Sequence, residues 1–167
     1  MSDDDTTPDA RDRIRALIAS NRVMTLASTG AGGPWVAPVF YAERFEADTR
    51  PWLVFVSSPS SRHVAELAAD PRAAAAIHGD ASDWRTLRGV QIAGRVQALE
   101  GDALHTARGA YATKFPQIGD PAQAPEAIAR AFARVRWFAL RAERIFLTDN
   151  AVSFGSREEI VYARAGD

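Results

Sequence analysis

The sequence predicts a mainly β fold, of class β or α+β: a small six-stranded Greek-key barrel with a few short helices. Short runs of β-branched and aromatic residues, separated by turn-forming residues, recur through the first half of the chain. Helical periodicity is limited to short segments. The 167 residues show no internal repeat and no long linker. We therefore expect one domain, residues 9–167, behind a disordered acidic lead at residues 1–8.

The first element is a short helix that follows this lead. Thr7 offers an N-cap, Pro8 a first-turn proline and Asp9 a first-turn acid. Apolar residues from Ile14 onward then mark a single helical face. The pattern ends near Ser20, where the chain changes to strand periodicity.

Three sequential strands, connected as hairpins, are predicted at residues 23–27, 35–42 and 51–58. The second and third of these strands carry apolar side chains on both faces. Such a strand needs cover on both sides, one from the barrel interior and the other from a ligand, a helix or a second subunit. These strands therefore hint at an interface in addition to the core.

The rest of the chain alternates between helix and strand periods. Residues 87–99 form the clearest strand, because apolar and polar side chains alternate along it. The other predicted elements are a helix at 60–70, a strand at 72–78, a helix from 101 to 116, a helix around 128–135 after a loop at 119–125, a strand at 135–148 and a small terminal strand within 151–162.

Composition excludes several classes of protein. The chain has no cysteine, so it contains no disulfide, thiol nucleophile or cysteine zinc site. A formal net charge of −1 argues against a nucleic-acid partner, which requires a basic excess. No apolar run is long enough for a membrane helix, and the first residues are acidic where a signal peptide is basic. We expect a cytoplasmic protein without membrane association. His63, His78 and His105 lack the spacing of metal ligands, so no metal site is predicted.

The segment from Ser57 to His63 is the strongest candidate for a binding site. Ser60 or Ser61 can cap the following helix, yet Arg62 and His63 place cations in its first turn, where the helix dipole disfavours them. A bound phosphate would make these cations favourable at the helix start, because backbone amides, serine hydroxyls and a guanidinium all bind an anion. The alternative is an ordinary capped helix with solvated side chains. Lys114 is the only lysine, so a single arginine in this arginine-rich chain is weak support.

Several motifs, in this order, resemble one known family. They are the strand from Trp35 to Tyr41, the strand from Trp52 to Ser58, Ser61-Arg62-His63 before a helix that closes with Asp70-Pro71, and Arg88-Gly-Val-Gln-Ile-Ala-Gly94. Together they look like the pyridoxamine 5′-phosphate oxidase-like, FMN-binding split-barrel superfamily. The ending Ile145 to Asn150 with Phe154-Gly155 is more similar to an uncharacterised branch than to the oxidase itself.

The resemblance implies a set of cofactor-binding residues. Ser57, Ser58, Ser61 and Arg62 match positions that hold the flavin phosphate, and His63 stands where the oxidases have lysine. The isoalloxazine ring rests on the strand that contains Pro38, Val39 and Phe40. The family glutamine that touches the ring aligns with Gly89, and Gln91, on the same strand face, can take its place. No match is found for the residues that hold pyridoxamine phosphate.

The resemblance further implies a homodimer with FMN at the subunit interface. The chemistry would be flavin redox chemistry on an unidentified small molecule, with NAD(P)H or oxygen as the electron partner. One alternative is an oxidoreductase that uses the deazaflavin F420. Others are a non-catalytic module that stores flavin or binds haem through His63, His78 or His105, and a dimer that has lost its cofactor. Trp84 is a candidate for lining a ligand pocket.

Overall fold

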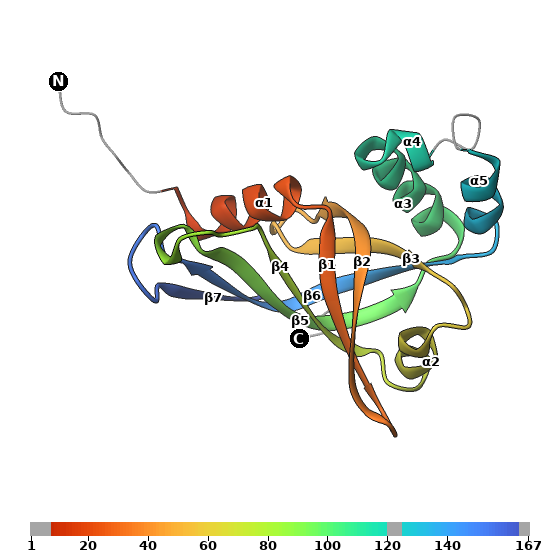
Figure 1. Cartoon of the computed structure of the whole chain (residues 1–167), viewed down its shortest axis with the longest axis horizontal. Coiled ribbons are helices and arrows are strands. Elements are labelled where there is room, and N and C mark those ends of the chain that lie inside the picture. The colour runs from red at the N-terminus through yellow and green to blue at the C-terminus, as the bar shows by residue number, and fades with distance from the viewer. Residues whose placement is uncertain (1–7, 120–124, 164–167) are drawn as a thin grey trace.

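The computed structural model of the chain describes residues 8–119 and 125–163. Seven antiparallel strands form one sheet in the order β3-β2-β1-β4-β5-β6-β7, and β3 also pairs with β6 (Figure 1). That pairing closes the first six strands into a barrel and leaves β7 as an extra strand beside β6. The strands are β1 (Val23–Gly30), β2 (Gly33–Phe45), β3 (Pro51–Ser57), β4 (Arg72–His78), β5 (Arg88–Ala98), β6 (Arg136–Asp149) and β7 (Arg157–Val161).

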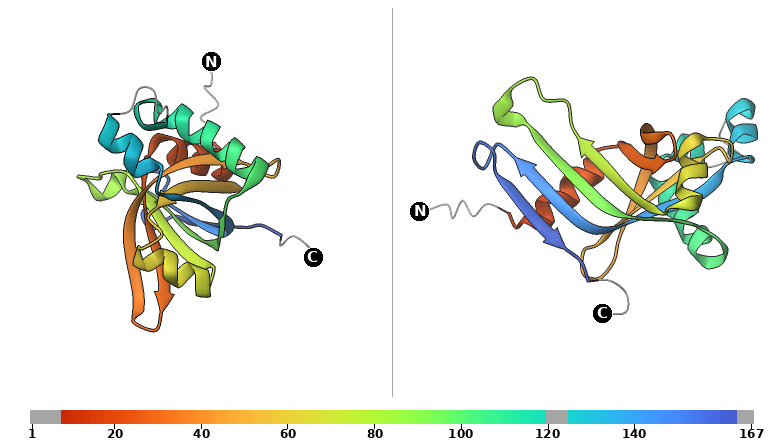
Figure 2. Two further views of the ribbon diagram at one scale, coloured as in Figure 1. Left: turned by 90° about the vertical axis from the view of Figure 1, so that its right-hand side faces the viewer. Right: turned by 90° about the horizontal axis from the view of Figure 1, so that it is seen from below.

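Short helices connect and cover these strands, as Figures 1 and 2 show. The six-stranded barrel with short helices that the sequence predicts is confirmed. The predicted acidic lead, apart from Pro8, and most of the 119–125 loop lie outside the described residues. The helices are α1 (Ala10–Ser20), α2 (Arg62–Ala69), α3 (Gly101–Lys114), α4 (Pro116–Gly119), α5 (Glu126–Phe132) and the single-turn 3-10 helix η1 (Trp84–Thr86).

The β1–β2 hairpin is longer than the sequence predicts. Gly30 pairs with Gly33, so the connection is a two-residue turn and the expected loop at 29–34 is mostly strand. Gly33 has a φ of 85°, a conformation that glycine adopts without strain. At its other end β2 runs on to Phe45, because Phe45 packs against the core and Glu43 is paired with Lys114.

The main core fills the barrel, and α1 contributes to it. Ile14 and Ile18 of α1 are almost fully buried among strand residues such as Leu26 and Ile92. The buried Tyr41 hydroxyl donates to the Ile18 carbonyl at 2.6 Å, which fastens the end of α1 to β2. The amphipathic helix predicted at the N-terminus therefore packs on the strands as an integral part of the barrel.

A second, smaller core lies outside the barrel, between β3 and α3. Val54 on β3 packs with Ala107 and Tyr111 of α3, and Trp137 of β6 borders the same cluster. Figure 1 shows α3, α4 and α5 gathered on this side of the sheet. The outer face of strand 51–58 is thus covered by helices of the same chain, so its two apolar faces do not indicate a subunit interface.

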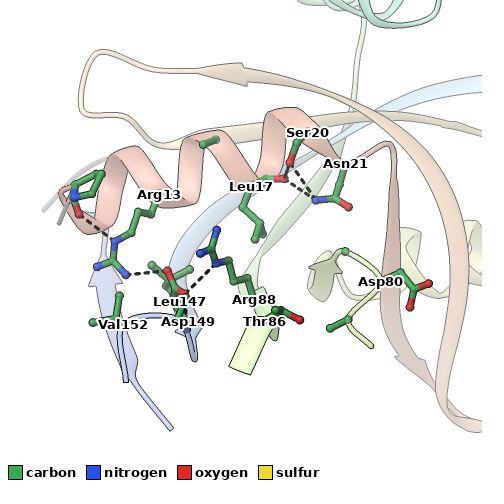
Figure 3. A pocket seen from close by; sticks show the side chains of 15 residues that line it. Arg13, Leu17, Ser20, Asn21, Asp80, Thr86, Arg88, Leu147, Asp149 and Val152 are labelled. Atoms are coloured by element: carbon green, nitrogen blue, oxygen red, sulfur yellow. Dashed lines mark hydrogen bonds and ion pairs between the residues drawn. The ribbon is translucent and has the colours of Figure 1, made fainter. Parts of the chain in front are cut away.

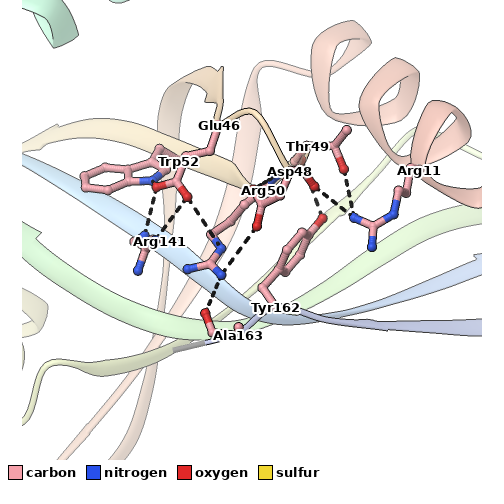
Figure 4. Close-up of polar contacts among 9 residues, drawn as sticks. All are labelled: Arg11, Glu46, Asp48, Thr49, Arg50, Trp52, Arg141, Tyr162 and Ala163. Atoms are coloured by element: carbon pink, nitrogen blue, oxygen red, sulfur yellow. Dashed lines mark hydrogen bonds and ion pairs between the residues drawn. The ribbon is translucent and has the colours of Figure 1, made fainter. Parts of the chain in front are cut away.

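A polar cluster ties the β2–β3 hairpin to the C-terminal segment (Figure 4). Arg50 is 3% exposed, forms ion pairs with Glu46 and Asp48, and donates to the Ala163 carbonyl. Glu46 also accepts two hydrogen bonds of 3.0 Å from Arg141 on β6. Buried charges require such partners, because an unpaired charge inside a protein is strongly destabilising.

We predict that Gly94→Ala destabilises the barrel. At the irregularity between Ala93 and Gly94, a Cβ on Gly94 would lie 2.1 Å from the Arg141 carbonyl oxygen, so the backbone has to move. Overpacking of this kind costs about 1–3 kcal/mol or more. Chemical denaturation should show the loss, whereas Gly109→Ala in α3, with open space around it, should stabilise by about 0.5–1 kcal/mol. Equal stability of the two variants would contradict the assigned β5–β6 register.

Candidate functional site

The predicted phosphate segment forms a tight turn between β3 and α2. Ser61 is the residue before α2, but its hydroxyl donates to the Ser58 carbonyl at 2.8 Å and makes no capping bond to the helix. The Ser58 and Ser60 hydroxyls share a hydrogen bond of 2.9 Å at the surface. The Ser61 side chain therefore leaves the first amides of α2 uncapped, although the Val64 amide donates to the Ser61 carbonyl at 3.1 Å.

His63 lies on the buried side of this turn. Its Nε2 atom shares a hydrogen bond of 2.7 Å with the Ser57 hydroxyl and lies 3.3 Å from the Ser61 hydroxyl. Burial lowers the pKa of His63, and the nearby Glu66 carboxylate opposes this only in part. His63 is therefore neutral at pH 7 and does not supply the second cation that the sequence suggests for the first turn.

Arg62 points away from the serines, toward the β1–β2 hairpin. Its Nε donates to Glu66 at 2.7 Å, one terminal nitrogen donates to the Gly33 carbonyl at 3.1 Å, and its guanidinium lies 4.6 Å from the centre of the Trp35 ring. Glu66 in turn accepts a 2.6 Å hydrogen bond from the buried Ser28 hydroxyl. The Arg62 side chain is nevertheless 40% exposed, so part of its donor edge faces solvent.

The structure thus divides the predicted phosphate residues into two groups. Ser57, Ser61 and His63 are joined by hydrogen bonds, whereas Arg62 lies on the hairpin side of α2. Serine hydroxyls, uncapped amides and a partly free guanidinium fit an anion such as phosphate. The Glu66 carboxylate neutralises much of the Arg62 charge, so the turn carries little net positive charge.

The predicted ring-binding residues lie on the outer face of the sheet. The strand registers place Pro38, Thr25, Ala76 and Gln91 in one row across β2, β1, β4 and β5. Phe40 begins the next row. Val39 points the other way, partly buried against the core, so only its backbone belongs to this face. The structure therefore brings Pro38, Phe40 and Gln91 onto one surface.

Small side chains form the floor of this surface, which we call the outer sheet face. The residues at its centre are Thr25, Ala27, Ala74, Ala76, Gly89 and Ala93. Larger apolar side chains border it on the β1–β2 side: Val23, Val36 and Phe40 are 43%, 58% and 51% exposed. Gln91 borders the opposite side, where Arg157 of β7 donates to its side-chain oxygen at 3.0 Å. A flat ligand or a second protein surface can lie against such a floor.

Two features of this region were not predicted from the sequence. Glu66 was missed, although its position four residues after Arg62 is the spacing of a helical ion pair. The floor of small residues was missed because it needs the strand order β2-β1-β4-β5, which no local pattern reveals. Trp84 was a candidate for lining a pocket; it is 59% exposed and packs edge-on against Phe154.

Neither a metal site nor a membrane span is found in the part of the chain that the structure describes. Within residues 8–119 and 125–163, no three His, Asp or Glu side chains gather in a way that could hold a metal ion. No helix in those ranges is long and apolar enough to cross a bilayer.

Comparison with known proteins gives one family and several related folds. The family model described as pyridoxamine 5′-phosphate oxidase matches residues 10–149. The UPF0306 protein YhbP of Escherichia fergusonii is 28% identical over 144 residues, which cover 86% of this chain and 88% of YhbP.

Solved structures share the same architecture. A heme binding protein from Mycobacterium smegmatis superposes with a TM-score of 0.71 at 27% identity, over 93% of this chain but 59% of that protein. A FAD-binding protein from Mesorhizobium loti, 21% identical, matches 82% of this chain and 90% of its own with a TM-score of 0.59, which shows a common fold.

We predict that His63 makes the stability of the protein depend on pH. Because its pKa is lower in the folded chain than in the unfolded chain, the unfolded state binds more protons as the pH falls below about 6.5. Acidification from about pH 7 to about pH 5 should therefore destabilise the protein, and His63→Gln should reduce that loss. Denaturation at several pH values measures the difference. The same substitution at the exposed His105 of α3 is the control for replacing a histidine by glutamine.

Proposed function

Because the chain belongs to the pyridoxamine 5′-phosphate oxidase family, we propose that it is a flavoprotein that binds FMN. The phosphate lies at the start of α2 and the isoalloxazine ring lies on the outer sheet face. The observation that carries the proposal is the exposed floor of small side chains within the same sheet as the serine-rich turn. One polar end and one flat apolar surface match the two ends of FMN.

The turn before α2 offers the phosphate several kinds of donor. The first amides of α2 receive no cap from the Ser61 side chain, and the dipole of the helix favours an anion there. The Ser58 and Ser60 hydroxyls are exposed and can rotate toward a ligand. Arg62 supplies the positive charge, although Glu66 shares it. We therefore expect the phosphate to contribute to affinity chiefly through hydrogen bonds, with Arg62 as its one cation.

The outer sheet face offers the ring a flat surface of suitable width. The row from Pro38 on β2 to Gln91 on β5 spans three strand spacings, about 14 Å, and continues on β6 with Phe146. Between Pro38 and Gln91 stand only Thr25 and Ala76, whose short side chains leave room for a fused aromatic system. Gln91, held by Arg157, presents an amide at the ring edge.

A second copy of the chain is the proposed cover of the remaining apolar surface. Val36 and Phe40 are exposed on β2, and β2 pairs with β3 only from Tyr41 onward, so residues 33–40 form an open strand edge. Exposed apolar patches beside open edges mark interaction surfaces. A homodimer would bury this patch and enclose the ring between subunits.

A bound flavin would supply hydride or electron transfer, with a small molecule as substrate and NAD(P)H or oxygen as electron partner. The chain itself would hold the phosphate, shield the ring from water and shape the space above it. We expect this to take place in the cytoplasm. An alternative to FMN is the deazaflavin F420, which would bind the same outer sheet face and serve the same redox role.

Haem binding is the second candidate, and the similarity to the heme binding protein of M. smegmatis favours it. His63 is buried and bonded to Ser57, so iron ligation would require it to leave that bond. His78 is exposed at the end of β4, beside the outer sheet face, and is the freer ligand. The absorbance spectrum after addition of each cofactor separates the two candidates, because flavin and haem absorb in different bands.

We predict that Arg62→Gln weakens FMN binding by about 10–100-fold, the equivalent of losing a charged hydrogen bond worth about 1.5–3 kcal/mol. Riboflavin, which lacks the phosphate, should bind the native protein and the variant equally. Quenching of flavin fluorescence measures both affinities. Arg72→Gln, at the first residue of β4 beyond the far end of α2, is the matched control: Arg72 is paired with Asp70, and the variant should bind FMN normally. If the native protein binds FMN and riboflavin with equal affinity, the proposal that the turn before α2 binds the phosphate is wrong.

We predict that Val36→Glu converts a dimer into a monomer. The substitution places a charge in the middle of the exposed apolar patch, where burial against a partner would strip it of water. Val36 is solvent-exposed in the single chain, so the fold should be unaffected. Analytical ultracentrifugation gives the molar mass. Val161→Glu, equally exposed on β7, should leave the native assembly unchanged. If the native protein sediments as a monomer, the proposal that a second copy of the chain covers this apolar patch is wrong.

A further inference from the structure

A cavity of about 730 Å³ lies between α1 and the loops at one end of the barrel (Figure 3). Its walls come from α1, from the connection of β4 to β5 and from the turn of β6 into β7. Its volume is within the range of sites that hold metabolites and exceeds what a lone inorganic ion fills. The cavity contains none of the residues assigned to the flavin.

The floor of the cavity is organised around the buried carboxylate of Asp149. Asp149 is 4% exposed and accepts hydrogen bonds from Arg13 at 3.2 Å, from Arg88 at 3.1 Å and from the Ala151 amide at 3.1 Å. Arg13 is also paired with Glu158. The Asp149 carboxylate is therefore held in place by three hydrogen bonds from the chain itself.

Arg88 is the group left with capacity for a ligand. Only its Nε is bonded to Asp149, its side chain is 57% exposed, and its two terminal nitrogens have no hydrogen-bond partner among residues 8–119 and 125–163. Figure 3 shows the Arg88 guanidinium between Asp149 and α1. The bond to Asp149 fixes Arg88 in place, so its free edge is held ready for a carboxylate.

The charges of the cavity limit the kind of anion it can accept. Two arginines, Arg13 and Arg88, face two carboxylates, Asp149 and Asp80, so the lining has no net charge. A single negative charge on the free edge of Arg88 is favourable, whereas a dianion would meet repulsion from Asp80 and Asp149. The apolar part of the lining comes from Ala16, Leu17, Leu147, Ala151 and Val152.

We propose that this cavity is a binding site for a small organic acid, a monocarboxylate with an apolar body. Arg88 binds the carboxylate through its terminal nitrogens, Asp149 positions Arg88, and the α1 side chains cover the apolar body. The site goes beyond flavin binding and does not depend on it. The cavity lies beside the outer sheet face. Two of its lining residues are chain neighbours of residues on that face: Gly79 follows His78, and Arg88 precedes Gly89.

The test is a titration of the ¹⁵N-labelled full chain with benzoate and with hexanoate, followed by amide chemical shifts. We expect saturable shifts, with dissociation constants of millimolar order or lower, centred on Leu17, Arg88 and Val152. Benzyl alcohol and hexanol, which lack the charge, should bind at least about tenfold more weakly, as the loss of a charged hydrogen bond requires. Inorganic phosphate should give no saturable shift there.

Arg88→Gln should weaken benzoate binding at least about tenfold, while Arg95→Gln should not change it. Arg95 is the matched control: it lies on the same strand, is similarly exposed and is bonded through its Nε to a carboxylate, but it does not line the cavity. Arg88→Lys, which keeps the charge, serves if Arg88→Gln fails to fold, and it should lose affinity through the missing fork.

Absence of saturable shifts with both acids, or equal affinity of native protein and the Arg88 variants, would overturn the proposal. Tighter binding of phosphate than of benzoate would also overturn it, since that would indicate a phosphate site. FMN binding, followed by flavin fluorescence, is measured on the same Arg88→Gln sample. A loss of acid binding with FMN binding retained separates this site from the flavin site, and failure of either one is visible independently of the other.

Discussion

The pairing of β3 with β6 is the contact on which the other features depend. It turns an open sheet into a barrel, so that each strand has one face inside and one outside. Once the barrel is closed, every outward apolar side chain needs separate cover. α3 and α5 provide it over β3 and β6, where Val54 and Trp137 are packed. α3 also covers the end of β2 on its outer side, where Ala42 is buried and Phe115 packs edge-on against Phe40. The small-residue floor lies beyond this contact, on the neighbouring strands β1, β4 and β5.

The same closure fixes where the serine-rich turn lies relative to the β1–β2 hairpin. Ser57 is the last residue of β3 and pairs with Arg136 of β6, so the turn begins where the closing seam ends. α2 then carries the chain from β3 to β4, and Arg62 reaches across to Gly33 at the tip of the β1–β2 hairpin. α2 therefore links the seam to the β1–β2 hairpin.

Local patterns were sufficient to predict most of the fold. Strand β4 was predicted with its observed limits because Pro71 and Gly79 mark both ends, and the alternation of β5 identified its buried face. The two apolar faces of β3 were also predicted, and a helix was one of the covers considered for the outer face. The sequence did not show which of these covers applies, because α3 lies more than forty residues later in the chain. The state of His63 depends on its burial beside Ser57, and the charge available on Arg62 depends on Glu66 and Ser28. Such contacts follow from strand order and packing, which a local pattern does not contain.

Arg62 and Arg88 show why an arginine-rich sequence does not by itself locate an anion site. Both side chains are exposed in part, and both are bonded through Nε to a carboxylate of the same chain. Arg62 also donates a hydrogen bond to the Gly33 carbonyl and lies over the Trp35 ring. The terminal nitrogens of Arg88, in contrast, have no acceptor in the described chain. Arg62 is therefore partly satisfied before any ligand arrives, and a ligand there gains less from it than its charge suggests. Arg88 is fixed by one bond and otherwise free, which is the arrangement that gives a guanidinium its full effect on an incoming carboxylate.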